Sequence, residues 1–141
     1  LNWIDADSRK NNKYLWGGTL GPDFDCSGLV QTAFSKYEIW LPRDAYQQEQ
    51  FCEKIEVCLE NPENILPGDL LFFGSESKCT HVAIYIGQGL YFHSSGKGFG
   101  NNGIGRDSII EFKNNSVSSY YHSIFRRASR VVNSYQSSDF L

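Results

Sequence analysis

The stretch that decides the fold is FDCSGLVQTAFSKY, residues 24–37. Its apolar side chains follow the i, i+1, i+4, i+5, i+8 spacing of a helix with one buried face. They are Leu29, Val30, Ala33, Phe34 and Tyr37. Because Asp25 is a suitable N-cap residue, the pattern predicts a helix over 25–37 with Cys26 in its first turn.

A second, shorter helix is predicted from Asp44 towards Cys52, because Asp44 and Gln47 have the spacing of a capping box. After Pro67 the sequence changes to short β-type runs separated by glycines and polar residues. The expected strands are 70–73, 82–86, 90–93, 109–112 and 130–133, the expected late helix is 118–125, and 96–105 is expected to be a loop. Helices first and strands afterwards predict an α+β domain with an antiparallel sheet.

The chain has 141 residues, the size of one ordinary domain, and we expect a single domain over 1–141. It begins at Leu1 and contains no methionine, so we expect it to be cut from a longer chain. A net charge of −3 argues against a nucleic-acid partner, which would require a basic face. No apolar run reaches the roughly 18 residues of a membrane span, so none is predicted. We expect a water-soluble monomer.

The cysteines have neither the spacing of a metal site nor the density of a disulfide framework. They are Cys26, Cys52, Cys58 and Cys79. We therefore expect reduced thiols, no metal and no cofactor. If Cys26 is a working nucleophile, an odd number of cysteines remains, which cannot all pair within the chain. This favours a reducing compartment, and we expect the cytoplasm ahead of the periplasm or the exterior.

Cys26 and two of the three histidines are candidates for nucleophilic catalysis. A thiol at a helix start lies near unpaired N–H groups and the positive end of the helix dipole, which favour the thiolate. His81 and His93 flank a predicted hairpin that turns at 87–89. Because side chains alternate along a strand, a three-residue turn puts both histidines on one face, whereas a two-residue turn without a bulge separates them. The Gly-Gln-Gly sequence favours three residues.

These spacings leave two interpretations open. In one, a nucleophile, a base and an orienting residue are supplied by Cys26, His81 and His93. In the other, Cys26 is a buried structural thiol and the two histidines are ordinary strand residues.

Several motifs in a fixed order carry a resemblance to a known family. They are YLWGG at 14–18, FDCSGLV at 24–30, LPR at 41–43, LPGDL at 66–70, and HVAIYIG at 81–87 followed by His93. Together they resemble the NlpC-type family of papain-like cell-wall cysteine peptidases from bacteria. The resemblance implies a papain-like α+β fold, in which the helix with the nucleophilic cysteine packs on an antiparallel sheet that carries the histidines.

The same resemblance implies the catalytic roles: Cys26 is similar to the family nucleophile, His81 to the base and His93 to the orienting third member. Four further positions match residues suited to binding the substrate. Asp25 and Ser27 resemble groups that bind the ammonium of a free L-Ala terminus, although Asp25 is equally suited to being only an N-cap.

Two more residues have a functional and a structural interpretation. Tyr14 resembles a family tyrosine whose hydroxyl can donate to the developing oxyanion, but it also fits a packing role. Arg43 is suited to holding a substrate carboxylate, or to pairing with an acidic neighbour and shaping its loop.

Family members typically hydrolyse peptidoglycan stem peptides, often between γ-D-glutamate and a diamino acid, either meso-diaminopimelate or lysine. The resemblance therefore implies an endopeptidase that acts through an acyl-enzyme, with a stem peptide or its fragment as partner. Two alternatives stay open: a binding module of the same fold without catalysis, and a papain-like amidase or acyltransferase.

Overall fold

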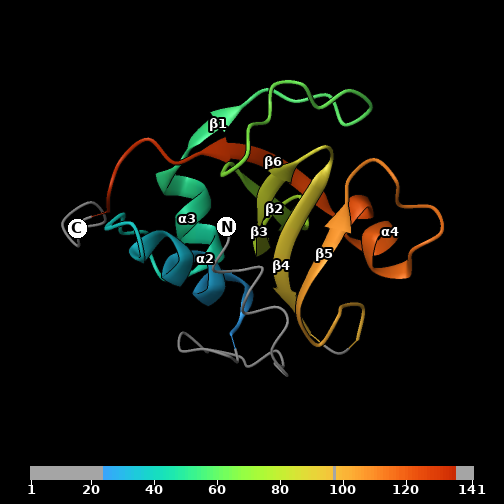
Figure 1. The fold of residues 1–141 in the computed structure, drawn as a ribbon, viewed down its shortest axis with the longest axis horizontal. Helices are drawn as coiled ribbons and strands as arrows, with labels where there is room; N and C mark the ends of the chain where they lie inside the picture. Colours follow the sequence, from blue (N-terminus) through green and yellow to red (C-terminus); the bar gives the residue numbers. More distant parts are fainter. Residues whose placement is uncertain (1–23, 97, 136–141) are drawn as a thin grey trace.

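The computed structural model describes residues 24–96 and 98–135. Within these ranges, two helices come first and are followed by five strands, a further helix and a sixth strand, an α+β arrangement (Figure 1). The elements are α2 (Cys26–Ser35), α3 (Ala45–Phe51), β1 (Glu53–Ile55), β2 (Leu70–Gly74), β3 (Cys79–Gly87), β4 (Leu90–Ser95), β5 (Gly103–Ser108), α4 (Ser116–Ser123) and β6 (Phe125–Arg130). No helix in this part of the chain combines the length and the apolar character needed to cross a membrane.

The strands form one antiparallel sheet in the order β1-β6-β2-β3-β4-β5. Helices α2 and α3 pack on one face of the sheet and contact β3 (Figure 1). Helix α4 lies beside β5, the edge strand at one end of the strand order. Alternation along the strands divides the core into two clusters. Phe72, Val82 and Ile84 pack towards α2 and α3, whereas Phe73 and Ala83 pack on the opposite face. The predicted α+β fold with an antiparallel sheet is confirmed.

Both predicted early helices are present. The Asp25 side chain caps α2 by accepting the backbone N–H of Gly28 at 2.6 Å, as the N-cap prediction required. Helix α3 begins after Asp44, whose backbone N–H donates to Oε1 of Gln47 at 3.1 Å.

The β3–β4 hairpin differs from its prediction in the turn. Gln88 and Gly89 both have positive φ, 55° and 79°, and form a two-residue turn closed by the Gly87↔Leu90 pair. A bulge before Gly87 then shifts the register. The three-residue turn was wrong, but the bulge restores the parity, so His81 and His93 lie on one face as predicted.

The second half of the chain contains the other corrections. Residues 109–112 are not a strand; the strand before them is β5, whose glycines made it look like the end of a loop. The last strand is β6 and ends at Arg130, so the strand expected over 130–133 was also wrong. Helix α4 confirms the expected late helix, and the three-residue β1 was not predicted.

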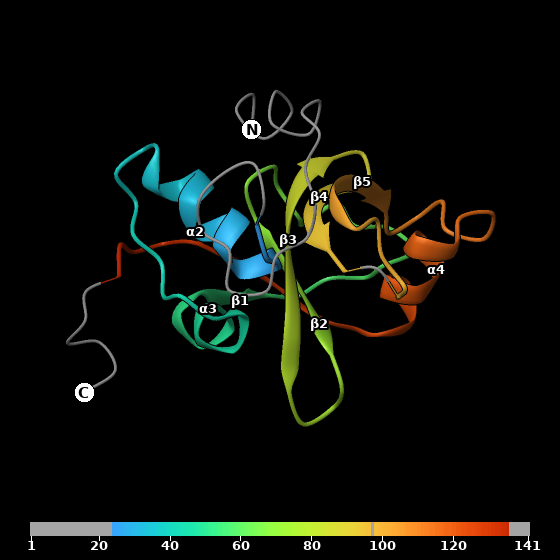
Figure 2. The same ribbon diagram turned by 90° about the horizontal axis from the view of Figure 1, so that it is seen from below.

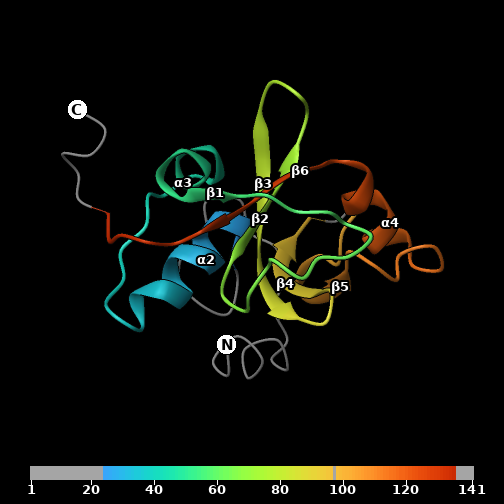
Figure 3. The same ribbon diagram turned by 90° about the horizontal axis from the view of Figure 1, so that it is seen from above.

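The β2–β3 hairpin extends beyond the neighbouring strands and lies beside α3 (Figures 2 and 3). A register shift between Phe73 and Gly74 places a bulge at Thr80 near the start of β3. The bulge turns Cys79 to the α2 side of the sheet, while His81 keeps the opposite side. The loop end of the hairpin therefore lies next to the start of α2.

Candidate active site

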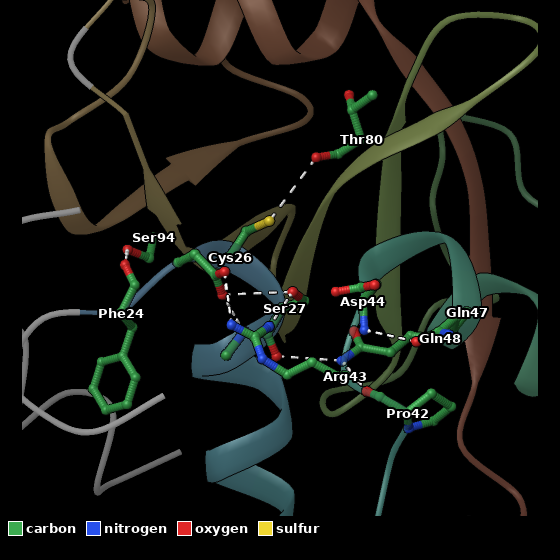
Figure 4. Close-up of polar contacts among 12 residues, drawn as sticks. Phe24, Cys26, Ser27, Pro42, Arg43, Asp44, Gln47, Gln48, Thr80 and Ser94 are labelled. Carbon is green, nitrogen blue, oxygen red and sulfur yellow. Dashed lines mark hydrogen bonds and ion pairs between the residues drawn. The ribbon is translucent and has the colours of Figure 1, made fainter. Parts of the chain in front are cut away.

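Cys26 is the first residue of α2 and is 6% exposed. Its Sγ lies 4.0 Å from the carbonyl oxygen of Thr80 in β3 (Figure 4). On the other side of the helix start, the Ser94 hydroxyl of β4 donates to the Phe24 carbonyl at 2.6 Å. The start of α2 is thus held by both β3 and β4, beyond the end of their common ladder.

Burial dominates the electrostatics of the Cys26 thiol and raises its pKa to about 11. The negative charge of Asp25 raises it further, whereas backbone N–H groups, first that of Val82 and then those at the helix start, lower it. The backbone N–H groups at the helix start therefore favour the thiolate, as expected, but burial opposes it more strongly. At neutral pH the thiol is protonated and needs a base.

A cavity of about 660 Å³ opens beside this thiol. Its walls come from the start of α2, the start of α3 with the residues before it, and the loop end of the β2–β3 hairpin. The lining residues include Asp25, Cys26, Ser27, Arg43, Tyr46 and Lys78. A substrate peptide in this cavity would therefore lie against the thiol.

Three of the predicted binding residues meet in one hydrogen-bonded group (Figure 4). Arg43 donates through Nη2 to Oδ2 of Asp25 at 2.8 Å and through Nη1 to the Ser27 hydroxyl at 2.9 Å. Asp25 thus acts as the N-cap of α2, and Arg43 pairs with an acidic neighbour. These are the structural roles that the sequence allowed for the two residues. Tyr14, the fourth predicted binding residue, lies outside the described residues.

His81 and His93 are in direct contact on the opposite face of the sheet. Nε2 of His81 lies 2.7 Å from Nδ1 of His93, and both rings are buried. The His81 ring stacks on Tyr121 of α4 at 4.5 Å between centroids. The Cys26 thiol contacts the backbone carbonyl of Thr80, the residue before His81 in β3. The hydrogen-bond partner of the thiol among the described residues is therefore this carbonyl and not the His81 ring.

A carboxylate that the sequence analysis missed completes this chain of contacts. Oδ2 of Asp107 lies 2.7 Å from Nε2 of His93. Asn101 donates to the same oxygen at 2.9 Å, and the Ser118 hydroxyl donates to Oδ1 at 3.0 Å. Burial opposes ionisation of Asp107, but the hydrogen bonds from His93, Asn101 and Ser118 outweigh it and lower its pKa.

The ionised carboxylate fixes the tautomers of both histidines. Because Asp107 can only accept, neutral His93 carries its proton on Nε2 and presents the lone pair of Nδ1 to His81. His81 then donates from Nε2, so its own lone pair is on Nδ1. Burial, with a smaller contribution from His93, moves the pKa of His81 well below its usual value, so this imidazole is neutral at neutral pH. A neutral, correctly protonated base is what a protonated thiol requires.

No group of three or more histidine, cysteine or acidic side chains is placed to hold a metal ion in the part of the chain that the structure describes. All four cysteines are free thiols. The site therefore offers nucleophilic and acid–base groups from its own side chains.

A helix that starts with a buried thiol and packs on an antiparallel sheet with paired histidines defines a papain-like α+β domain. The family model described as NlpC/P60 family matches residues 11–131. The chain belongs to the NlpC/P60 family, as its motifs suggested.

Individual relatives agree with this assignment. The chain is 42% identical over 117 residues to the bifunctional muramidase/DL-endopeptidase CwlT of Bacillus subtilis, covering 77% of this chain and 34% of that protein. It is 37% identical over 84 residues to a gamma-D-glutamyl-L-lysine dipeptidyl-peptidase of Bacillus cereus, covering 57% and 24%. The chain thus spans about a third or less of the length of these relatives.

A solved structure from Staphylococcus aureus, described as similar to lipoprotein and of the NLP/P60 family, superimposes with a TM-score of 0.68 at 29% identity. The match covers 92% of this chain and 40% of that one. The likeness therefore extends over almost the whole papain-like domain.

Proposed function

We propose that this protein is a cysteine endopeptidase that hydrolyses peptidoglycan stem peptides at the bond between γ-D-glutamate and a diamino acid. The observation that carries the proposal is the Cys26 thiol at the wall of the cavity, with the hydrogen-bonded pair of His81 and His93 on the neighbouring strands β3 and β4. The names of the two Bacillus relatives, a DL-endopeptidase and a gamma-D-glutamyl-L-lysine peptidase, support the bond.

The reaction uses the side chains in a fixed order. For the thiol to reach Nδ1 of His81, the Cys26 side chain must turn away from the Thr80 carbonyl, past the end of the β3–β4 ladder. It then gives its proton to Nδ1 of His81 while Sγ attacks the scissile carbonyl carbon. The backbone N–H of Cys26, which has no acceptor within its helix, donates to the developing oxyanion. His81 then protonates the leaving amine, and a water molecule, deprotonated by His81, hydrolyses the thioester.

The Asp25–Arg43 ion pair bears on how the substrate is recognised. Because the charge of Asp25 is balanced by Arg43, a substrate ammonium gains little from it. We therefore propose that a free L-Ala terminus is not required. The roles predicted for Ser27, Arg43 and Tyr14 in substrate binding stay predictions.

Three further expectations stay predictions: the single domain over 1–141, the monomeric state and the cytoplasmic location. The free thiols were the reason for expecting a reducing compartment. The names of the relatives, which refer to wall hydrolases, give the cytoplasm no support.

The decisive experiment incubates the purified protein with L-Ala-γ-D-Glu-meso-diaminopimelate, its lysine analogue and their N-acetylated forms, followed by mass spectrometry of the products. We expect release of the diamino acid from both free and acetylated peptides. The Cys26→Ala variant should release none, whereas Cys58→Ala, which removes an exposed thiol, should behave as the wild type.

The alternatives give different results. A binding module would bind the peptides without products in every variant. An amidase or acyltransferase would keep a reactive Cys26 but release no diamino acid. Full activity of Cys26→Ala would exclude the thiol mechanism.

A further inference from the structure

Asp107 is a buried carboxylate whose hydrogen bonds run to the catalytic histidines. It is 4% exposed and lies in β5, the edge strand beside β4. The distances from Asp107 to His93 and from His93 to His81 are both 2.7 Å. An uninterrupted line of hydrogen bonds therefore connects this carboxylate with the proposed base, and the bond between Asp107 and His93 is charge-assisted.

The backbone places Asp107 there through the register of β4 and β5. His93 pairs with Gly105 and Tyr91 pairs with Asp107, so the carboxylate lies diagonally across from His93 on the same face. A Cβ on Gly105 would collide with the Asn101 side chain that donates to Asp107. The glycine thus leaves room for the amide that holds the carboxylate.

We propose that Asp107 is a positioning residue of this site: through His93 it keeps the Nδ1 lone pair of His81 available to the Cys26 thiol and stabilises the imidazolium that forms. The inference rests on the proposed hydrolase function and adds a fourth member to its catalytic set.

The negative charge of Asp107 matters here because the resting thiol of Cys26 and the resting ring of His81 are both uncharged. A preformed thiolate–imidazolium pair would need only a neutral third residue, but burial keeps the thiol protonated and His81 uncharged. Charge therefore appears only during attack, and the Asp107 carboxylate lies where it can stabilise the new cation.

The other groups that face this line do not replace the carboxylate. His93 is next to Tyr91 and Tyr121, and His81 is next to Phe73 and Tyr121. Asn101 and Ser118 are neutral donors to Asp107, and Arg106 lies over Phe92 on the other face. Among the described neighbours, Asp107 is thus the group that supplies negative charge to His93.

The test uses nitrogen NMR of the three histidine rings together with activity of the Asp107→Asn variant. In the wild type we expect both His81 and His93 to carry the neutral proton on Nε2. In Asp107→Asn we expect kcat to fall about 10- to 1,000-fold with little change in KM, and the pH dependence of kcat to change. The matched control Glu111→Gln removes an exposed carboxylate of the following loop and should keep wild-type values.

The outcomes separate this inference from the proposed function. If nitrogen NMR finds the proton of wild-type His93 on Nδ1, the inference is overturned. This measurement needs no substrate and does not depend on whether Asp107→Asn folds. Wild-type kcat and pH profile in a folded Asp107→Asn would overturn it as well. If the wild type cleaves no peptide, the proposed function fails, and the wild-type tautomers still decide whether Asp107 orients the pair.

Discussion

Arg43 Nη2 lies 2.8 Å from Oδ2 of Asp25, the residue that caps the helix carrying the nucleophile. The contact joins the loop before α3 to the start of α2, and a second hydrogen bond from Arg43 to Ser27 fixes its orientation. Arg43 therefore balances a carboxylate that lies directly beside the Cys26 thiol.

Removing this cation should affect both stability and the thiol. We expect Arg43→Ala to lower the free energy of unfolding by about 1–2 kcal/mol, because a partly buried ion pair loses one partner. The unbalanced Asp25 should also slow alkylation of Cys26 at a given pH, since its charge opposes the thiolate. Urea unfolding and site-resolved alkylation measure the two effects. Lys113→Ala, an exposed cation elsewhere, should change neither.

The pH dependence of alkylation should show the neutral resting state. Because burial raises the pKa of Cys26 to about 11, its reaction with iodoacetamide should accelerate steadily from pH 7 to beyond pH 9. A thiolate–imidazolium pair would instead react at a nearly constant rate from acid to neutral pH. Mass spectrometry of the Cys26 peptide separates its rate from that of the exposed Cys58, and an early plateau would contradict the neutral state.

The buried neutral His81 should make the protein sensitive to acid. Its pKa is lowered in the folded state, so below the unfolded value of roughly 6.5 the unfolded chain binds a proton that the folded chain does not. Stability should then fall with decreasing pH, by up to about 1.4 kcal/mol per pH unit. Unfolding free energies between pH 7.5 and 5 measure the slope. His81→Gln should reduce the slope of the unfolding free energy against pH by the contribution of one proton. His122→Gln, which lies outside the histidine pair, should keep the wild-type slope.

Local patterns predicted the parts of the fold that depend on few residues. The helix after Asp25 could be read from its cap and spacing, and the common face of His81 and His93 followed from parity. The turn could not be read as easily, because a bulge and a positive φ at Gln88 replaced the expected three-residue loop. His81 and His93 therefore share a face because of a two-residue turn and a bulge, and not because of a three-residue turn.

The parts that depend on long-range contacts were missed for physical reasons. Strand β5 contains two glycines, which weaken any β-type pattern, so Asp107 had no predicted partner. The rise of the Cys26 pKa by burial could not be predicted, because the helix start is visible in the sequence, whereas burial depends on the whole fold. The first gap left out a member of the site, and the second concerns its electrostatics.

The bulge at the loop end of the β2–β3 hairpin should depend on Gly74. This residue has a φ of 153°, and an added Cβ would collide with the backbone carbonyl of Lys78. We expect Gly74→Ala to cost about 2–4 kcal/mol of stability and to lower kcat/KM, because the hairpin lines the cavity. Gly98→Ala, where a Cβ meets open space, is the matched control. Equal melting temperatures of the two variants would contradict the role of the bulge.

Gln48 should hold the nucleophile helix against the Arg43 loop. Its fully buried amide donates from Nε2 to the carbonyls of Ser27 and Pro42, at 3.2 and 2.9 Å. Gln48→Glu keeps the shape but replaces the donor with an oxygen that faces two acceptors. The carboxyl must ionise against burial or stay protonated, and either outcome weakens the connection.

We therefore expect Gln48→Glu to lower the free energy of unfolding at pH 7 by about 2–4 kcal/mol and to recover part of this loss at pH 5, where a protonated carboxyl can donate one hydrogen bond. Gln50→Glu, on the exposed side of the same helix, introduces the same charge without these contacts and should stay close to the wild type. Urea unfolding of both variants at the two pH values makes the comparison. Protonation of His81 lowers the free energy of unfolding of every variant at pH 5, so the two variants are compared with each other at each pH. Equal free energies of unfolding for Gln48→Glu and Gln50→Glu at both pH values would contradict the role of the Gln48 amide.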